Sequence, residues 1–383
     1  MNADLNLKIE LETESIFNEL SRISSIINQV TEKNSDLTKV LVLGQAGSGK
    51  SSIISTLTNQ EVKVKKKEKK FLKFLEGKNI FNEYRDNPDK YLITIDNNSK
   101  MIYFECPIET DENLKGKIIR SFFIDKIFQE NPNLENKIKI LLVASISDIQ
   151  CCHGTNIYVL VDFICNLLNF NENLIKNVGF VITKCDRQDN KYLIVDELSY
   201  RKESLYKLMK NMSIDNFFSF PIPRKDQLNA PYHYEDHDSL MQFLAKDPLV
   251  NPKYKIEISD YRMTIVLDII LHKMSKLMKN IFDKIEIEYQ ECIKSEEKCH
   301  LKDLMFDVMK HEFKSVKDIE TFFRENIQSV SEYEEYLNEM KSIEYLDSFM
   351  SKVFDSKWSL ELNKMICSLS QETIDSLHLT DNS

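Results

Sequence analysis

Glycine is scarce in this sequence, with only 7 glycines among 383 residues. Three of them, Gly44, Gly47 and Gly49, fall within a stretch of six residues. A chance cluster is a weak explanation in a chain so poor in glycine. We therefore interpret the cluster as a loop whose backbone needs the conformational freedom of glycine.

Long apolar runs are also missing, and none approaches the roughly 20 residues that span a bilayer. The first residues, MNADLNLKIELETES, lack the basic-then-apolar order of a signal peptide. We therefore expect no transmembrane segment and a cytoplasmic location. The chain has 8 cysteines, which we expect to be free thiols in a reducing compartment.

An excess of positive charge is absent as well. The 51 Lys and Arg residues are outnumbered by 61 Asp and Glu residues, which gives a formal net charge of -10. This balance argues against general nucleic-acid binding, so any basic site must be local. The lysine run KVKKKEKK at 63–70 could contact acidic lipid headgroups, act as a nuclear import signal or touch nucleotide phosphates, but such runs are more often solvated loops.

Predicted strands and helices alternate over the first two thirds of the chain. Apolar residues at helical spacing predict an amphipathic helix over 12–31, and a β-branched apolar strand follows at 38–43. Further strands are predicted at 91–95, 100–105, 137–144, 177–183 and 216–220, and further helices at 112–129, 155–169 and 194–212. This alternation predicts an α/β fold, in which a three-layer domain is built on a mostly parallel sheet.

Three regions are predicted: an N-terminal helix over 1–36, the α/β domain over 37–250 and an α-helical C-terminal module over 251–383. Within the α/β domain, the polar stretch 59–89 is interpreted as an inserted loop with a short helix. In the C-terminal module, apolar stripes predict one long helix from Leu267 to Ile285 and another from Tyr336 to Val353. These stripes most often pack against a neighbouring domain, but they could instead form a dimer surface or bind a protein partner.

The segment GQAGSGKS at 44–51 matches the phosphate-binding pattern G-x-x-x-x-G-K-S/T in full. Its glycines allow the backbone to wrap a phosphate and to aim several N–H groups inward. We expect Lys50 to reach the outer phosphates and Ser51 to ligate Mg²⁺, at the positive end of the following helix. The predicted phosphate-binding residues are Gly44, Ala46, Gly47, Ser48, Gly49, Lys50, Ser51 and Ser52.

The segment TKCD at 183–186 follows the strand predicted at 177–183. A carboxylate at Asp186 could accept hydrogen bonds from the ring N–H and the exocyclic amine of guanine, whereas adenine presents no such pair of donors. A four-residue match is common by chance, and an ordinary polar turn between a strand and a helix is the alternative. Its place at a strand end after a phosphate loop favours a guanine site.

Through GQAGSGKSS, YFECP and VITKCD, the chain resembles P-loop GTPases of the translation-factor-related class, nearest their septin-like and immunity-associated branch. The resemblance covers about residues 38–225 and leaves the helical module out. It implies a GTPase-like domain that binds GTP or GDP with Mg²⁺, and a guanine site of Thr183, Lys184 and Asp186. It also implies a candidate homodimer through the nucleotide-binding face, because septin-like GTPases often associate there.

Two elements that sense the γ-phosphate in that family are altered or missing. Where D-x-x-G is expected, the chain reads Glu105, Cys106, Pro107 and Ile108, and D-x-x-G occurs nowhere else. The first switch normally supplies a threonine, yet residues 59–93 contain neither Thr nor Ser, and Thr94 belongs to a predicted strand. Glu105 is retained as a candidate ligand of Mg²⁺ through water.

These departures favour a guanine-nucleotide-binding protein with weak or absent hydrolysis, acting in signalling or assembly, over an active GTPase. The reason is that a ligand shifts conformations only through differential contacts. No residue is identified that would orient the attacking water, so the catalytic residues are unassigned. Two alternatives stay open: a nucleotide-independent pseudo-GTPase that serves as an interaction module, and a P-loop ATPase or small-molecule kinase that uses Glu105 as its acidic residue.

Overall fold

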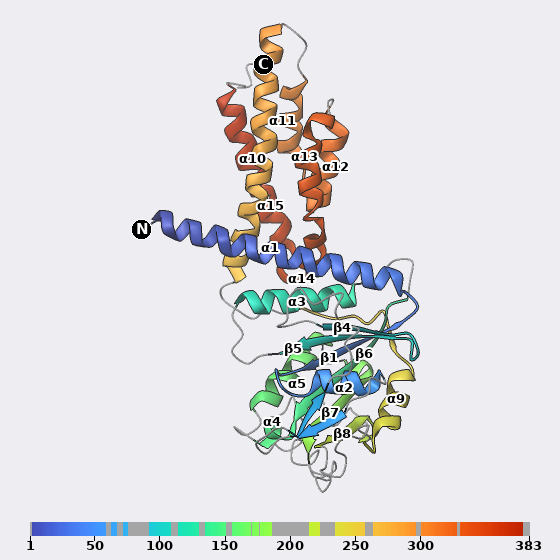
Figure 1. The fold of residues 1–383 in the computed structure, drawn as a ribbon. Helices are drawn as coiled ribbons and strands as arrows, with labels where there is room; N and C mark the ends of the chain where they lie inside the picture. The colour runs from blue at the N-terminus through green and yellow to red at the C-terminus, as the bar shows by residue number, and fades with distance from the viewer. Residues whose placement is uncertain are drawn as a thin grey trace. The chain divides into compact units, whose positions relative to one another are not determined.

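The computed structural model contains two compact units (Figure 1). The helical unit comprises Met1–Ile27, Lys117–Phe123 and Ile258–Ser383, and the α/β unit comprises Asn28–Gly116 and Ile124–Glu257. The structure describes residues 2–58, 63–66, 72–75, 92–108, 114–129, 135–150, 155–169, 171–175, 177–185, 214–222, 234–256, 263–295, 300–327 and 330–377.

In the described residues, the α/β unit is built on a seven-stranded sheet whose main path runs β4-β5-β1-β6-β7-β8, with β9 pairing to β6. The strands are β1 (Thr38–Gly44), β4 (Leu92–Asp96), β5 (Met101–Pro107), β6 (Lys137–Ser145), β7 (Val178–Cys185), β8 (Phe217–Pro221) and β9 (Leu249–Val250). The five strands from β5 to β8 along this path are parallel to their neighbours, whereas β4 is antiparallel to β5 and β9 is antiparallel to β6. The expected α/β fold with a mostly parallel sheet is therefore confirmed.

Helices cover the sheet because its central strands are apolar on both faces. On one face, side chains of β1, β5, β6, β7 and β8 form a buried cluster with α2 (Lys50–Leu57) and α9 (His237–Ala245). On the opposite face, Leu41, Leu142 and Phe180 are also fully buried. The other helical segments described in this unit are the end of α1 (Asn2–Lys33), the two ends of α3 (Leu114–Phe128), α4 (Ile146–Gln150), α5 (Thr155–Leu167), α6 (Glu172–Ile175) and the 3-10 turn η3 (Ile214–Asn216).

Two polar side chains hold the C-terminal end of α3 within this unit. The Lys39 Nζ donates a hydrogen bond to the Ile127 carbonyl at 3.0 Å, and the Asn136 Nδ2 donates to the Phe128 carbonyl at 3.0 Å. They satisfy carbonyls that a helix end leaves without helical partners. Burial lowers the pKa of Lys39 to about 8.

The stretch 59–89 departs from the predicted loop with a short helix. Its described parts are two strands, β2 (Lys63–Lys66) and β3 (Leu72–Leu75), which pair antiparallel with Val64 opposite Phe74. The prediction is therefore wrong for these segments, since a β-branched residue opposite an aromatic one favours strand pairing. The rest of the stretch, and the helix predicted at 194–212, lie outside the described residues.

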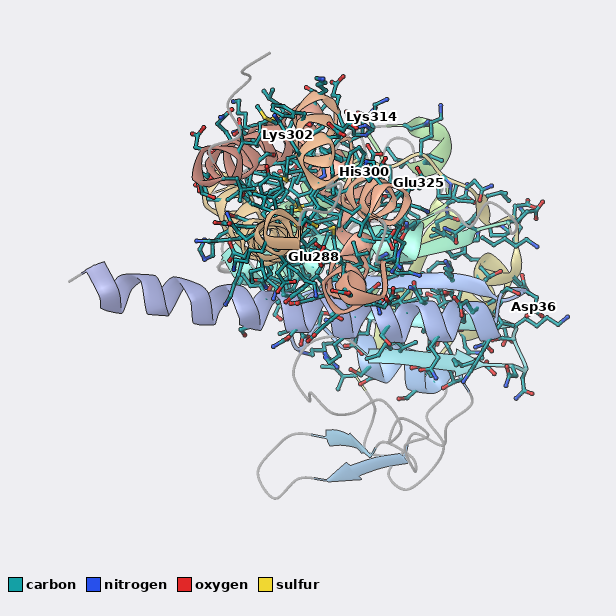
Figure 2. All side chains as sticks on the ribbon, turned by 90° about the horizontal axis from the view of Figure 1, so that it is seen from above. Asp36, Glu288, His300, Lys302, Lys314 and Glu325 are labelled. Carbon is teal, nitrogen blue, oxygen red and sulfur yellow. The ribbon has the colours of Figure 1, made fainter. Side chains whose placement is uncertain are left out.

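The helical unit contains α1 (Asn2–Lys33) up to Ile27, a central segment of α3 and the helices after residue 262. These later elements are α10 (Met263–Ser295), α11 (Leu301–Lys310), α12 (Val316–Asn326), α13 (Val330–Lys341), the 3-10 turn η5 (Glu344–Leu346), α14 (Asp347–Phe354) and α15 (Ser356–Ser376). Figure 2 labels Glu288, which belongs to α10, Lys302, which belongs to α11, and Glu325, which belongs to α12. Apolar stripes form the core, as Leu277, Leu337 and Leu362 show by their near-complete burial.

The single helix predicted from Tyr336 to Val353 is wrong, because α13 ends at Lys341 and α14 begins at Asp347. Ser342 Oγ donates to the Glu339 carbonyl at 2.5 Å, a local bond of the kind that competes with helix continuation. Asp347 then accepts hydrogen bonds from the Val316 and Lys317 N–H groups at 2.8 and 3.1 Å. The break therefore frees Asp347 to cap the start of α12.

Among the described residues, no helix has both the length and the apolarity needed to cross a membrane. Cysteines of both units are free thiols where the structure describes them: Cys106, Cys165, Cys185, Cys292 and Cys367.

Candidate functional site

The glycine-rich loop lies at the centre of the sheet, between the end of β1 and the start of α2. β1 pairs with β5 on one side and with β6 on the other. The next strands of the sheet in chain order, β4 and β5, therefore lie on one side of β1, and the later strands β6, β7 and β8 lie on the other. In open α/β sheets, ligands bind outside the carboxyl ends of the strands at such a switch point. The loop therefore lies where a ligand is expected.

The three glycines of the loop meet two different demands. A Cβ on Gly44 would lie 2.2 Å from the Val143 carbonyl oxygen, which no side chain tolerates. Gly47 and Gly49 have φ angles of 77° and 100°, in the left-handed region that favours glycine. A Cβ on Gly47 would meet nothing within 4 Å, so that side of the loop is open.

Lys50, the first residue of α2, holds the loop from within. Its Nζ donates hydrogen bonds to the carbonyls of Gly44 at 3.0 Å and Gln45 at 2.8 Å, and the residue is only 3% exposed. Its ammonium group lies at the N-terminal end of α2, where the helix dipole is also positive. An anion in the loop would meet both charges, with little water to screen them.

Ser51 and Glu105 form a second polar pair beside this lysine. The Ser51 Oγ donates to the Glu105 carboxylate, 3.0 Å from Oε1 and 2.9 Å from Oε2. Glu105 belongs to β5, is 9% exposed, and its Oε1 lies 3.9 Å from the Lys50 Nζ. A hydroxyl and a carboxylate are hard oxygen donors of the kind that Mg²⁺ prefers.

This pair alone does not make a complete metal site. Across the part of the chain that the structure describes, no group of three or more His, Cys, Asp or Glu side chains is placed to hold a metal ion. Mg²⁺ usually takes one or two protein ligands and completes its octahedron with water and substrate phosphates. Ser51 and Glu105 therefore fit Mg²⁺ as the partner of a bound phosphate, rather than as a site that binds the ion alone.

The structure brings Thr183 and Lys184 of the TKCD segment directly onto the glycine-rich loop. The Thr183 Oγ1 donates to the Ser48 carbonyl, and the Lys184 Nζ donates to the Gly47 carbonyl at 2.6 Å. Lys184 has a φ angle of 57°, and the pairing of β7 with β8 shifts register beside it. Such a conformation is costly for a non-glycine residue and is typical of functional sites. Asp186 lies outside the described residues.

The remaining predicted phosphate-loop residues differ in their exposure. Ala46 and Gly47 are exposed and Ser52 is half-buried. Ser48 is 1% exposed, and its hydroxyl has no hydrogen-bond partner among the described residues. Ser48 is therefore bonded to the end of β7 through its backbone and not through its side chain, because Thr183 contacts the Ser48 carbonyl.

Of the two positions where a γ-phosphate sensor is expected, Thr94 lies within a strand and Ile108 directly follows one. The Ile108 N–H, at the place of the expected D-x-x-G glycine, donates to the Gly44 carbonyl at 2.9 Å. Thr94 lies within β4 opposite Tyr103, whereas Leu92 is the residue opposite Glu105. In this arrangement the Ile108 N–H joins β5 to the start of the loop.

Sequence reasoning missed one polar group at the same edge of the sheet. The Ser145 Oγ donates to Asp148 Oδ2 at 2.6 Å, and the Asp148 N–H donates back to Ser145 Oγ at 3.2 Å. Ser145 ends β6 and pairs with Thr183 of β7, so this group borders the TKCD segment. The signal was present, because Ser-x-x-Asp matches a capping-box pattern.

No protein-family model matches this chain, and no curated protein matches its sequence.

Proposed function

We propose that this chain binds a guanine nucleotide, GDP or GTP, together with Mg²⁺, through a P-loop GTPase-like α/β unit. One observation carries the proposal: Thr183 and Ser48, which are 135 positions apart in the sequence, are joined by a hydrogen bond, and Lys184 reaches the neighbouring Gly47. A phosphate-binding pattern and a base-binding pattern therefore meet at one edge of the sheet. Both patterns follow strands of the same parallel sheet, and the two hydrogen bonds bring them into direct contact.

Each residue of the site has one proposed role. The loop N–H groups and Lys50 bind phosphate, and Ser51 with Glu105 binds Mg²⁺ beside it. Lys184 places its stem beside the loop, where it can cover the base. Asp186 selects guanine over adenine, because a carboxylate accepts from the two neighbouring donors that guanine presents and adenine lacks.

We propose that hydrolysis is weak or absent. In the residues after Glu105, the glycine that would read the γ-phosphate is replaced by Ile108, whose N–H is bonded to the Gly44 carbonyl. Thr94 belongs to the middle of a strand pair and lies across from Tyr103. GTP and GDP then make similar contacts, so their affinities should be similar and neither should switch the fold strongly.

The decisive experiment identifies the nucleotide and its base preference together. Nucleotide released from the purified protein is analysed by mass, and GDP, GTP, ADP and ATP are then titrated into the nucleotide-free protein in Mg²⁺. We expect GDP or GTP in the released fraction and micromolar or tighter binding of both. Equal affinity for ATP and GTP would contradict the base assignment and favour the P-loop ATPase or kinase alternative.

The pseudo-GTPase alternative has one observation in its favour. Lys50 and Ser51 are hydrogen-bonded within the protein itself, to two loop carbonyls and to Glu105, so the loop is held without a ligand. A purified protein free of nucleotide, with no shift in melting temperature on adding GTP and Mg²⁺, would establish this alternative. We also keep two further proposals, a homodimer through the nucleotide-binding face and a protein partner that binds the helical unit.

A further inference from the structure

The helical unit has a groove between α10 and α13, with a volume of about 470 Å³. The residues that α10 contributes to its lining are Asn280, Asp283, Lys284, Ile287, Glu288 and Glu291. They follow the three- and four-residue spacing that places side chains on one face of a helix. From the first to the last of them, the lining runs for roughly 16 Å, at about 1.5 Å per residue. The groove is therefore elongated along α10, which suits a segment of chain better than a single small ion.

Negative charge dominates this groove. Asp283, Glu288 and Glu291 of α10 and Glu332 of α13 line it, with Lys284 as the one basic residue among the lining side chains. The Lys284 Nζ lies 3.4 Å from the Glu332 Oε2, so the lysine is paired with one carboxylate. Asp283 and Glu291, by contrast, are exposed to solvent. The lining therefore carries more negative charge than its own lysine balances.

Glu288 shows the same shortage of positive charge from within the protein. Its Oε1 is buried and has no hydrogen-bond partner among the described residues. Burial raises the pKa of Glu288, and the nearby Glu332 carboxylate adds to this shift. Lys284 acts in the opposite direction and does not cancel it. A positive group from outside the chain would supply the partner that this carboxylate lacks.

Two further side chains of the groove suit the apolar part of a ligand. Ile287 lies within the α10 lining and is 60% exposed, and Tyr336 of α13 is half-buried. The methylene stems of lysine and arginine pack on such apolar surface while their charged ends reach carboxylates, and a guanidinium also stacks on a tyrosine ring. In the part of the chain that the structure describes, no three acidic, His or Cys side chains are placed to hold a metal ion, so these carboxylates do not converge on one point.

We propose that this groove binds a basic amphipathic helix of a protein partner. Such a helix presents side chains at the same three- and four-residue spacing as α10. Its lysines and arginines pair with Asp283, Glu288 and Glu291 along the groove, and its apolar residues cover Ile287. The site goes beyond nucleotide binding, because all its lining residues belong to the helical unit. It gives a place and a chemistry to the protein partner proposed for that unit.

The test measures binding of a fluorescent amphipathic peptide of about 16 residues, built from leucine, alanine, lysine and arginine, to the full chain. By fluorescence anisotropy, we expect a Kd of about 10 to 100 μM at roughly 50 mM salt, and at least about fivefold weaker binding at roughly 300 mM. Reversing two exposed charges, in the double variant Asp283→Lys and Glu291→Lys, should weaken binding at least about tenfold. Glu325→Lys, an exposed acidic residue of α12 outside the groove (Figure 2), is the matched control and should stay within about twofold of the wild type.

Ile287→Ser is an independent variant, because it leaves every carboxylate of the groove in place. It should weaken peptide binding about three- to tenfold while the salt dependence stays as in the wild type. Circular dichroism and thermal unfolding check that each variant is folded.

A scrambled peptide of the same composition separates a helix-binding groove from general attraction of positive charge. We expect it to bind at least about tenfold more weakly than the amphipathic peptide. Equal binding of the two peptides overturns the proposal, as do equal losses in Glu325→Lys and in the double variant. The nucleotide released from the purified protein is measured separately, so a failure here is distinguishable from a failure of the proposed nucleotide site.

Discussion

At the residue scale, buried charged side chains lie beside the glycine-rich loop. Lys50 is almost fully buried and is balanced by two carbonyls and by Glu105 at 3.9 Å. Burying a charge costs several kcal/mol unless it is paired and hydrogen-bonded, so such a residue is rarely retained for packing alone. The lysine is therefore the first residue to test.

Substituting Lys50 with alanine should lower GDP affinity by on the order of 100-fold, because it removes the proposed charge-assisted contact to phosphate in a poorly solvated site. Calorimetric titration in Mg²⁺ measures the change. Lys246→Ala, an exposed lysine after α9, should leave affinity unchanged. Equal losses in the two variants would contradict a specific phosphate contact of Lys50.

Lys39 predicts a dependence of stability on pH. Burial lowers its pKa to about 8 in the folded chain, against 10.5 for the ordinary group, and Lys139 is lowered to about 8 in the same way. Above pH 8, the unfolded chain therefore holds more protons than the folded chain, so the free energy of unfolding rises with pH.

Lys39→Met should remove roughly half of this rise between about pH 7.5 and 9.5, a window below the range where tyrosines ionise. In the variant, the increase in the free energy of unfolding across this window should be smaller by on the order of 1 kcal/mol. Urea unfolding across this window measures it. Identical slopes in the two proteins would show that the Lys39 ammonium does not titrate with a lowered pKa.

At the scale of elements, the turn from β1 to α2 depends on glycine for two different reasons. Gly44 leaves no room, since an added Cβ would lie 2.2 Å from the Val143 carbonyl oxygen of the neighbouring strand. Gly47 has open space around it and a φ angle of 77°. One glycine is required by packing and the other by backbone conformation.

Gly44→Ala should therefore destabilise the α/β unit by at least about 3 kcal/mol, because β1 and β6 must separate. Gly47→Ala should cost only about 1 kcal/mol, the strain of alanine in the left-handed region. Urea unfolding of both variants compares them directly. A larger loss for Gly47→Ala would reverse this assignment of causes.

In the helical unit, Asp347 joins the start of α14 to the start of α12. It accepts from two N–H groups of α12, and burial nevertheless raises its pKa. Asp347→Ala should lower the free energy of unfolding by about 1 to 2 kcal/mol, the usual effect of losing an N-terminal cap. Thermal unfolding measures the loss, with the exposed Glu335→Ala as the control; an equal effect of both would contradict the capping role.

At the scale of the whole molecule, the strands and the loop could be predicted from the sequence, but most contacts between them could not. Apolar runs predict the central strands because such strands are buried on both faces. The hydrogen bond from Ser51 to Glu105 depends on the register of β5 against β1, and the contact of Thr183 with Ser48 depends on that of β7 against β6. Neither register can be predicted from the residues of a single strand.

The end of α13 shows a second reason for failure. Helical spacing of apolar residues continues through Ser342, so periodicity alone predicts one helix. The chain breaks there because Asp347 has partners in α12, a stretch about 30 residues earlier. Tertiary contacts of this kind override local pattern, and the two strands within 59–89 were missed because short strands carry too little periodicity.

The hydrogen bonds from Thr183 and Lys184 to two neighbouring carbonyls of the loop have one more consequence. They couple the loop to the end of β7, so a ligand group that orders one segment also orders the other. Affinities for the separate fragments of a ligand should then not add up to the affinity for the whole. By thermodynamic reciprocity, inorganic pyrophosphate in the loop should strengthen binding of a nucleoside at β7 by the same factor that the nucleoside strengthens binding of pyrophosphate.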